Sequence, residues 1–208
     1  MTRIGMGAAA GLVAGTTFLA SMLSSPGAVA TSTTTEPTYA IGIRPASVSL
    51  VATAPPWRLP ADARPYIAAA GLALHAGVPT GGFEVHLDIR ADGHRVPVPA
   101  GVGEAILDGA VMGVSGLFTE DTSGVVHVVG DGTPPFTLGQ VFEEWGVPFS
   151  VSQLGGYAAG PATRLVVTVN GKPVNDPAAV VLRPDEEIAL WFGPATARPE
   201  APHHYHFS

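Results

Sequence analysis

The chain has 208 residues, no cysteine, and 10 basic against 17 acidic side chains, which give a formal net charge of −7 at pH 7. The lack of cysteine excludes disulfides, a lipid-bearing cysteine, thiolate chemistry and Cys-ligated zinc. The shortage of basic side chains argues against a nucleic-acid partner, because binding to phosphates requires them.

The N-terminal residues have the layout of a secretory signal peptide. Arg3 precedes an apolar stretch rich in glycine and alanine, and Pro26 is followed by the small-x-small triplet at 28–30. This pattern predicts cleavage before Thr31 and a secreted or cell-surface protein. The alternative is a retained membrane anchor, since the stretch approaches the length of about 20 residues that spans a bilayer. Its small side chains make it weakly hydrophobic for a stable span.

Composition divides the rest of the chain into three parts. Residues 31–56 are rich in Thr, Ser and Pro and predict a linker. Residues 57–193 contain the strand and helix patterns and predict a single domain, whose length is ordinary for one domain. Residues 194–208 form a Pro- and His-rich C-terminal tail, and we expect its aromatic side chains, Tyr205 and Phe207, to dock on the domain surface.

A proline-rich segment at residues 55–74, here called the strap, leads into the domain, and strand patterns follow it. Trp57 and Tyr66 are expected to anchor the strap, and a short helical turn is predicted at 66–72. Alternating or continuous apolar side chains then predict strands. The predicted strands lie at 83–90, 124–129 and 186–193, and the dipeptides that favour tight hairpin turns are Asp92-Gly93 and Asn170-Gly171.

One helix is well marked, at residues 138–145. Thr137 and Gln140 have the spacing of a capping box, in which each side chain satisfies a backbone donor at the helix start. An apolar stripe at helical spacing is expected to pack on the sheet, and it consists of Leu138, Val141, Phe142 and Trp145. Glu143 and Glu144 are interpreted as part of the solvated outer face.

These elements together indicate the α+β class. We expect a mostly antiparallel β-sheet packed on one principal helix, because hairpins and strands surround a single helical pattern. A β-grasp-like arrangement is the favoured interpretation. A β-sandwich with an incidental helix is the alternative.

The strand at 83–90 poses the main functional question. Its apolar residues are expected to face the helix, which leaves Glu84, His86, Asp88 and Arg90 on the opposite face. The simplest interpretation is the solvated face of an antiparallel sheet.

A metal site is the competing interpretation of the same face. Glu120 lies in a turn-rich loop just before the strand that carries His127. If this strand neighbours the strand at 83–90, Glu84, His86, Glu120 and His127 can converge on one ion. A set of imidazoles and carboxylates suits Zn, Mn or Fe.

Several blocks of the chain resemble a family of uncharacterised bacterial exported and membrane-tethered proteins. The blocks include FEVHLDIRADGHRVPVPAGVG, TEDTSGVVHVV and FTLGQVFEEWGVP, and the likeness covers roughly residues 57–193. In that family the first block resembles His-x-His-x-His-Leu. The second resembles His-Thr-His-Asp followed by Gly-(Val/Ile)-Ile-His-Ile-Glu. The resemblance implies a metal site and no particular reaction.

Carried over residue by residue, the family pattern is only partly present. His86 and His127 match family histidines, and Asp121 matches the aspartate. Glu84 and Glu120 stand where the pattern has histidine, and their carboxylates would supply oxygen ligands in place of imidazole nitrogen. The chain also departs from the pattern at Gly82, Phe118 and Val129. The implied metal-ligand set is Glu84, His86, Glu120, Asp121 and His127.

No catalytic residue is predicted, since the chain has neither a nucleophile elbow nor a phosphate loop. The first functional hypothesis is an exported, non-enzymatic module of the cell envelope with a divalent-metal or small-ligand site. The second is a structural or protein-interaction module whose ancestral site has decayed. The third is a small metal-dependent hydrolase or oxidoreductase, with Glu84 or Glu120 as general base.

The leader pattern makes a direct prediction about the N-terminus. Mass spectrometry of the culture medium should find a mature protein that starts at Thr31, because the triplet at 28–30 follows a weakly hydrophobic stretch. Recovery of only the intact chain, in membranes, would instead identify a retained anchor.

Overall fold

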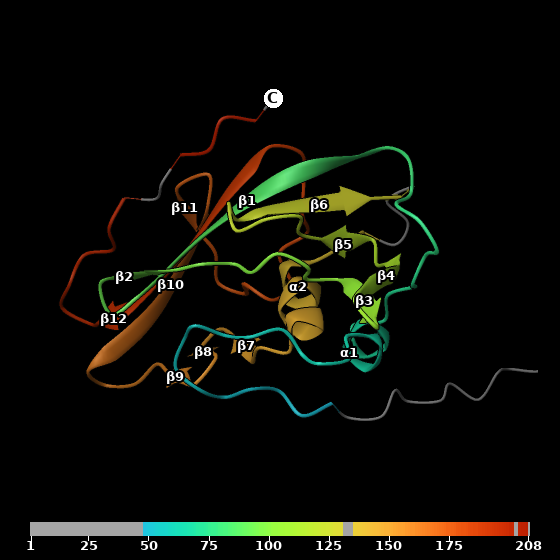
Figure 1. The fold of residues 1–208 in the computed structure, drawn as a ribbon. Helices are drawn as coiled ribbons and strands as arrows, with labels where there is room; N and C mark the ends of the chain where they lie inside the picture. Colours follow the sequence, from blue (N-terminus) through green and yellow to red (C-terminus); the bar gives the residue numbers. More distant parts are fainter. Residues whose placement is uncertain (1–47, 131–134, 202–203, 208) are drawn as a thin grey trace, which may run out of the picture. The chain divides into compact units, whose positions relative to one another are not determined.

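The computed structural model of the chain describes residues 48–130, 135–201 and 204–207 (Figure 1). These residues belong to one compact unit. The predicted signal peptide and the linker up to residue 47 lie outside the described residues. Mixed and antiparallel sheets with few helices make the protein β-rich and are consistent with the α+β class. Within the described ranges, no helix has the length and apolar character that a membrane span requires.

The largest sheet is mixed, with one parallel pair at its centre. In spatial order its strands are β11 (Lys172–Pro173), β10 (Thr163–Val169), β12 (Glu186–Pro194), β1 (Gly82–Ala91), β6 (Val125–Val129) and β5 (Leu117–Phe118). A further strand, β2 (His94–Val96), pairs with β1. β1 runs parallel to β12 and antiparallel to β6. The predicted strands at 83–90, 124–129 and 186–193 are therefore confirmed, and the first two are neighbours.

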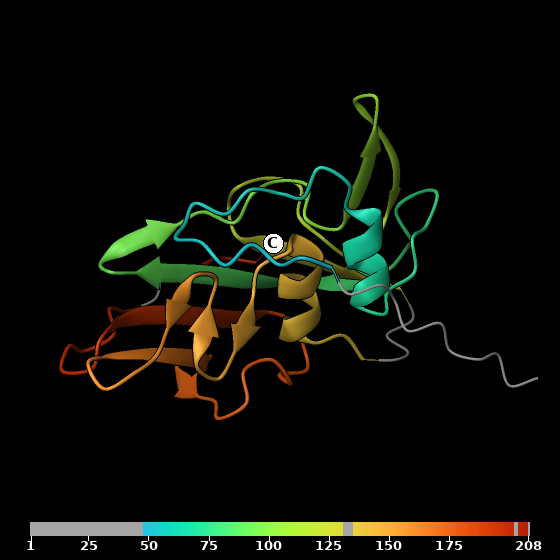
Figure 2. The same ribbon diagram turned by 90° about the horizontal axis from the view of Figure 1, so that it is seen from below.

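The remaining elements lie around this sheet. They are α1 (Arg64–Ala69), α2 (Leu138–Trp145), the hairpin β3 (Glu104–Leu107) with β4 (Ala110–Val114), and a three-stranded sheet of β7 (Phe149–Ser150), β8 (Gln153–Leu154) and β9 (Tyr157–Ala158). Figure 2 shows the β3–β4 hairpin standing away from the main sheet. This hairpin was not predicted from the sequence, although Asp108-Gly109 gives it the same kind of turn as the two predicted hairpins.

The two predicted hairpin turns are confirmed by their backbone angles. Asp92 and Gly93 have φ values of 51° and 79°, and Asn170 and Gly171 have 49° and 74°. Two successive positive φ values match the twist of the flanking strands, and Asp, Asn and Gly tolerate them best.

Helix α2 has the predicted bounds and the predicted cap. The Gln140 backbone N–H donates to the Thr137 hydroxyl at 3.4 Å, and the Thr137 N–H donates to Gln140 Oε1 at 2.9 Å. Gly146 ends the helix with a left-handed φ of 78°. The apolar stripe is fully buried, and its members are Leu138, Val141, Phe142 and Trp145. The stripe joins the inward side chains of β1 in one hydrophobic core.

The strap packs closely on α2, starting earlier in the chain than predicted. The rings of Trp57 and Trp145 meet edge to face, with centroids 5.6 Å apart. Before Trp57, the Val51 N–H already donates to the Gly146 carbonyl at 2.8 Å. The folded part therefore begins before Trp57, where composition had placed its boundary, and the predicted helical turn at 66–72 lies at 64–69 as α1.

The interpretation of Glu144 as a solvated residue is wrong. Its side chain is 1% exposed, whereas Glu143 is partly exposed. The reason is that α2 has neighbours on two sides. The sheet covers the apolar stripe. Helix α1 packs beside α2, and the segment that carries Ser115 contacts Glu144 itself.

Substituting the buried indole tests the packing of α2. Trp145→Ala should lower the free energy of unfolding by about 3 to 5 kcal/mol, because it removes a fully buried aromatic ring from the centre of the core. Urea unfolding measures the change. Glu143→Gln is the control on the same helix and should leave stability nearly unchanged, so equal losses for the two variants would mean that this packing is incorrect.

Candidate functional site

The polar face of β1 is largely covered rather than open. His86 lies opposite Glu187 of the parallel strand β12, and its Nδ1 is 2.8 Å from Glu187 Oε2. Its Nε2 lies 3.2 Å from the Ser123 carbonyl oxygen. The Tyr205 ring stacks on the imidazole with centroids 5.1 Å apart. His86 is therefore 1% exposed, with both ring nitrogens directed at protein oxygens.

Three further contacts hold the C-terminal tail over His86. The Tyr205 N–H donates to Glu187 Oε1 at 2.5 Å, and Phe207 packs edge-on against the Tyr205 ring. Earlier in the tail, Glu200 forms an ion pair with Arg90 of β1. These contacts confirm that Tyr205 docks on the domain, and Phe207 packs on Tyr205.

Asp88, the next polar residue on this face of β1, forms ion pairs with two arginines. Asp88 is 2% exposed, and its carboxylate lies 3.5 Å from Arg90 Nε and 3.6 Å from Arg95 Nε. A buried carboxylate requires such compensation. The sequence allowed two interpretations of this face, a solvated surface or a metal site. In the structure, His86 and Asp88 are buried and paired with protein groups, and together they form a polar layer beneath the tail.

His127 forms a separate cluster at the other end of the strand. It lies opposite Glu84, with Nδ1 3.4 Å from Glu84 Oε1, and its Nε2 is 3.9 Å from Glu120 Oε2. The Phe118 ring stacks on it with centroids 4.9 Å apart. A shallow hollow of about 280 Å³ adjoins Glu84 and His127. The two carboxylates face different edges of the imidazole, so one ion cannot bind all three groups as they stand.

Asp121 points into its own turn. Its carboxylate accepts a hydrogen bond from the Ser123 N–H at 2.8 Å, and the hydrogen bonds from Ser123, with the nearby His127, lower the pKa of Asp121. In the part of the chain that the structure describes, no three His, Asp or Glu side chains form a group that could hold a metal ion. A metal ion shared by the predicted ligands stays a prediction, and binding it would require several of these side chains to rotate.

A buried carboxyl elsewhere in the domain was missed by the sequence analysis. Glu144 of α2 reaches a pocket of about 360 Å³ between the strap and the β3–β4 hairpin. The other residues that line this pocket are Leu59, Pro60, Ala61, Ala63, Gly101, Glu104, Ile106 and Asp108. The volume lies in the range of small-molecule sites.

The contacts of Ser115 fit a protonated Glu144. Ser115 Oγ lies 2.5 Å from the Leu117 carbonyl oxygen and 2.7 Å from Glu144 Oε2, and it accepts from the Leu117 N–H at 3.0 Å. A hydroxyl has only one hydrogen to donate. If it goes to the Leu117 carbonyl, the Glu144 carboxyl must donate to Ser115.

Burial acts in the same direction. Desolvation raises the pKa of Glu144 well above its usual 4.5, and a hydrogen bond donated by Ser115 to the carboxylate would offset this only in part. Among the described residues, Glu144 Oε1 has no hydrogen-bond partner. A buried acceptor in this state is unfavourable, and a donor from outside the chain would satisfy it.

A second carboxyl at the pocket has a perturbed pKa. Partial burial raises the pKa of Glu104, and the negative charge of Glu120 raises it further. Asp108, in the hairpin turn, adds another acidic group. The described lining of the pocket includes no basic side chain.

Helical spacing contained a signal for Glu144. Glu144 follows Val141 by three residues and directly precedes Trp145, so it borders the apolar stripe, whereas Glu143 lies on the far side of the helix. Ser115 does not lie in a nucleophile elbow, so no role was predicted for it. Nothing local in the sequence links it to Glu144, which is 29 residues away.

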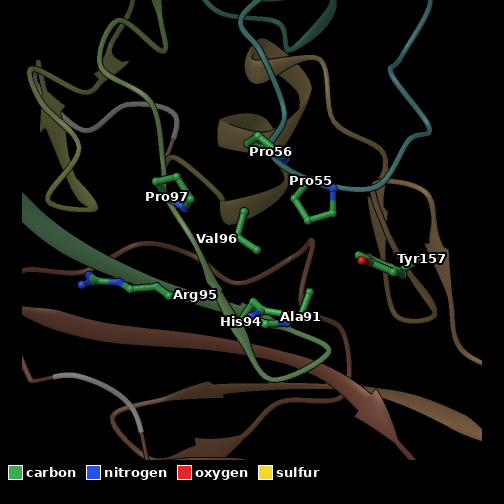
Figure 3. A pocket seen from close by; sticks show the side chains of 8 residues that line it. All are labelled: Pro55, Pro56, Ala91, His94, Arg95, Val96, Pro97 and Tyr157. Carbon is green, nitrogen blue, oxygen red and sulfur yellow. The ribbon is translucent and has the colours of Figure 1, made fainter.

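Another hollow of about 360 Å³ lies beside the β1–β2 turn (Figure 3). It is lined by Pro55, Pro56, Ala91, His94, Arg95, Val96, Pro97 and Tyr157. The Tyr157 ring stacks on Phe192 at 4.8 Å, and burial followed by the charge of Asp92 raises its pKa. Arg95 extends away from the prolines in Figure 3. Its guanidinium pairs with Asp88, at 3.6 Å. This hollow therefore offers a ligand mainly apolar contacts.

No family model, no curated protein and no solved structure matches this chain. Function is therefore inferred from the charges and geometry of the pocket at Glu144 and from the leader-like N-terminal sequence.

Glu144 should make stability depend on pH in a specific direction. The folded protein binds the Glu144 proton more tightly than the unfolded chain does, because burial raises the pKa of this carboxyl above 4.5. As the pH rises from 4.5 towards the raised pKa, the wild-type protein should lose stability relative to the Glu144→Gln variant. Urea unfolding of both proteins over a pH series measures the difference.

The same comparison contains its own control. Burial also raises the pKa values of Glu104 and Glu186, but both residues are present in both proteins, so their effect cancels in the difference. Parallel stability curves would show that Glu144 ionises alike in the folded and unfolded states.

Proposed function

We propose that this protein is an exported, non-enzymatic module that binds a small ligand in the pocket at Glu144. The leader-like sequence before Thr31 supports export, and the family resemblance points to the bacterial cell envelope. The observation that carries the proposal is the Glu144 carboxyl, which is 1% exposed and has an oxygen, Oε1, without a partner among the described residues.

The pocket supplies the other features of a ligand site. Its lining combines apolar side chains from the strap with a few polar groups, which is the usual composition of small-molecule pockets. Glu144 is fixed by a capped helix on one side and by Ser115 on the other. A ligand donor that reaches Oε1 would therefore meet an acceptor whose position is already set.

Binding is favoured over catalysis because of how Ser115 is held. Its hydroxyl is fully buried and is engaged by the backbone of Leu117 at both the carbonyl and the N–H. A serine nucleophile requires a hydroxyl that faces the substrate and a neighbouring base. A protonated Glu144 cannot act as that base.

For the fold, we propose a β-grasp-like arrangement. The supporting order is the antiparallel pair β1–β6, then α2, then β10 and β12, with β1 and β12 parallel at the centre of the sheet. Helix α2 packs its apolar stripe against the inward side chains of this sheet. The strap and the β3–β4 hairpin are additions to that frame, and together with α2 they form the pocket.

A fragment screen followed by NMR tests the proposed function. Small ligands with an N–H or O–H donor and an apolar body should shift the backbone amide signals of Ala61, Glu104 and Glu144. Ala61→Trp should abolish the shifts, because Ala61 is an exposed residue of the lining and an indole there would fill the pocket.

Ala162→Trp is the matched control. It places the same ring at an exposed position outside the lining and should leave ligand binding intact. Shifts that persist in the Ala61→Trp variant, or a screen without any ligand for this pocket, would contradict the proposal.

A further inference from the structure

We propose that the ligand is a small organic cation, a protonated amine on an apolar body, whose ammonium group binds the Glu144 carboxylate. This inference rests on the proposed function and specifies the ligand class. It follows from the charges that face the pocket, from the unpartnered oxygen and from the apolar walls.

The titratable side chains that line the described part of the pocket are all acidic. Glu144 enters from α2, while Glu104 and Asp108 enter from β3 and its turn. Glu120 lies close enough to Glu104 to raise its pKa. Because no basic side chain is part of the described lining, an anionic ligand would be repelled and a cation attracted.

The unpartnered acceptor of Glu144 suits an ammonium group. An ammonium carries three N–H donors and no acceptor, so it can satisfy Glu144 Oε1 without creating a new unpaired oxygen. Charged hydrogen bonds of this type are shorter and stronger than neutral ones. The remaining walls come from apolar residues and favour a hydrocarbon body, and they are Leu59, Pro60, Ala61, Ala63 and Ile106.

Binding of the cation should displace one proton. Below the raised pKa of Glu144, the free protein holds this carboxyl in its neutral form, and the ammonium stabilises the carboxylate instead. The Glu144 proton leaves to solvent, the amine keeps its own proton, and the Ser115 hydroxyl can turn to donate to Glu144 Oε2, which lies 2.7 Å away. Affinity for the amine should therefore increase with pH while Glu144 is still protonated in the free protein.

Two probes of matched size, benzylamine and benzyl alcohol, separate charge from shape. Isothermal titration calorimetry of the purified protein, run in two buffers with different ionisation enthalpies, reports both the affinity and the number of protons released. We expect benzylamine to bind about tenfold or more tightly than benzyl alcohol, with proton release that the alcohol does not cause.

Glu144→Gln is the decisive variant, because it keeps the shape and hydrogen-bonding capacity of the neutral acid. It should abolish proton release and weaken benzylamine binding to the level of benzyl alcohol, while the affinity for the alcohol stays unchanged. Its urea unfolding midpoint verifies the fold. Glu104→Gln provides a second test and should also weaken benzylamine binding, while retaining proton release.

The outcomes distinguish this inference from the proposed function. Equal binding of the two probes without proton release would overturn the cation inference and leave a ligand-binding pocket in place. Benzylamine binding that the Glu144→Gln substitution does not change would overturn the inference as well. If neither probe binds, both the inference and the proposed function fail.

Discussion

The parallel pairing of β1 with β12 is the constraint on which the rest of the structure depends. It places β1 inside the sheet, between β12 and β6, so that the strand has no free edge. Its inward residues, such as Leu87, must then pack against α2, and its outward polar residues must find partners across the neighbouring strands. The core and the paired polar layer beneath the tail are two consequences of one pairing.

Packing of α2 on that sheet also explains the pocket. The capped helix is fixed in rotation by its apolar stripe, so the orientation of Glu144 follows from the burial of Val141 and Trp145. The strap, anchored by Trp57 against Trp145, then covers the side of the helix that would otherwise be solvated. A carboxyl enclosed in this way loses hydration, which raises its pKa and leaves an oxygen for a ligand.

Local chemistry determined what could be predicted from the sequence. The bounds of α2 and the turns at Asp92-Gly93 and Asn170-Gly171 were correct because caps and tight turns depend on a few adjacent residues. The partner of His86 could not be predicted, since Glu187 is 101 residues away and meets it only through the parallel register. Glu144 was misassigned because, although it borders the apolar stripe, the segments that cover it lie far away in the sequence.

The most direct test of this account is the protonation state of Glu144 in the folded protein. Carbon-13 NMR of the glutamate carboxyl carbons, with Glu144 assigned by the signal that Glu144→Gln removes, follows each group through a pH titration. The account predicts that the Glu144 carboxyl titrates at a higher pH than those of Glu104 and Glu186, because it is the most deeply buried of the three. A titration midpoint near 4.5, the usual value for glutamate, would contradict it.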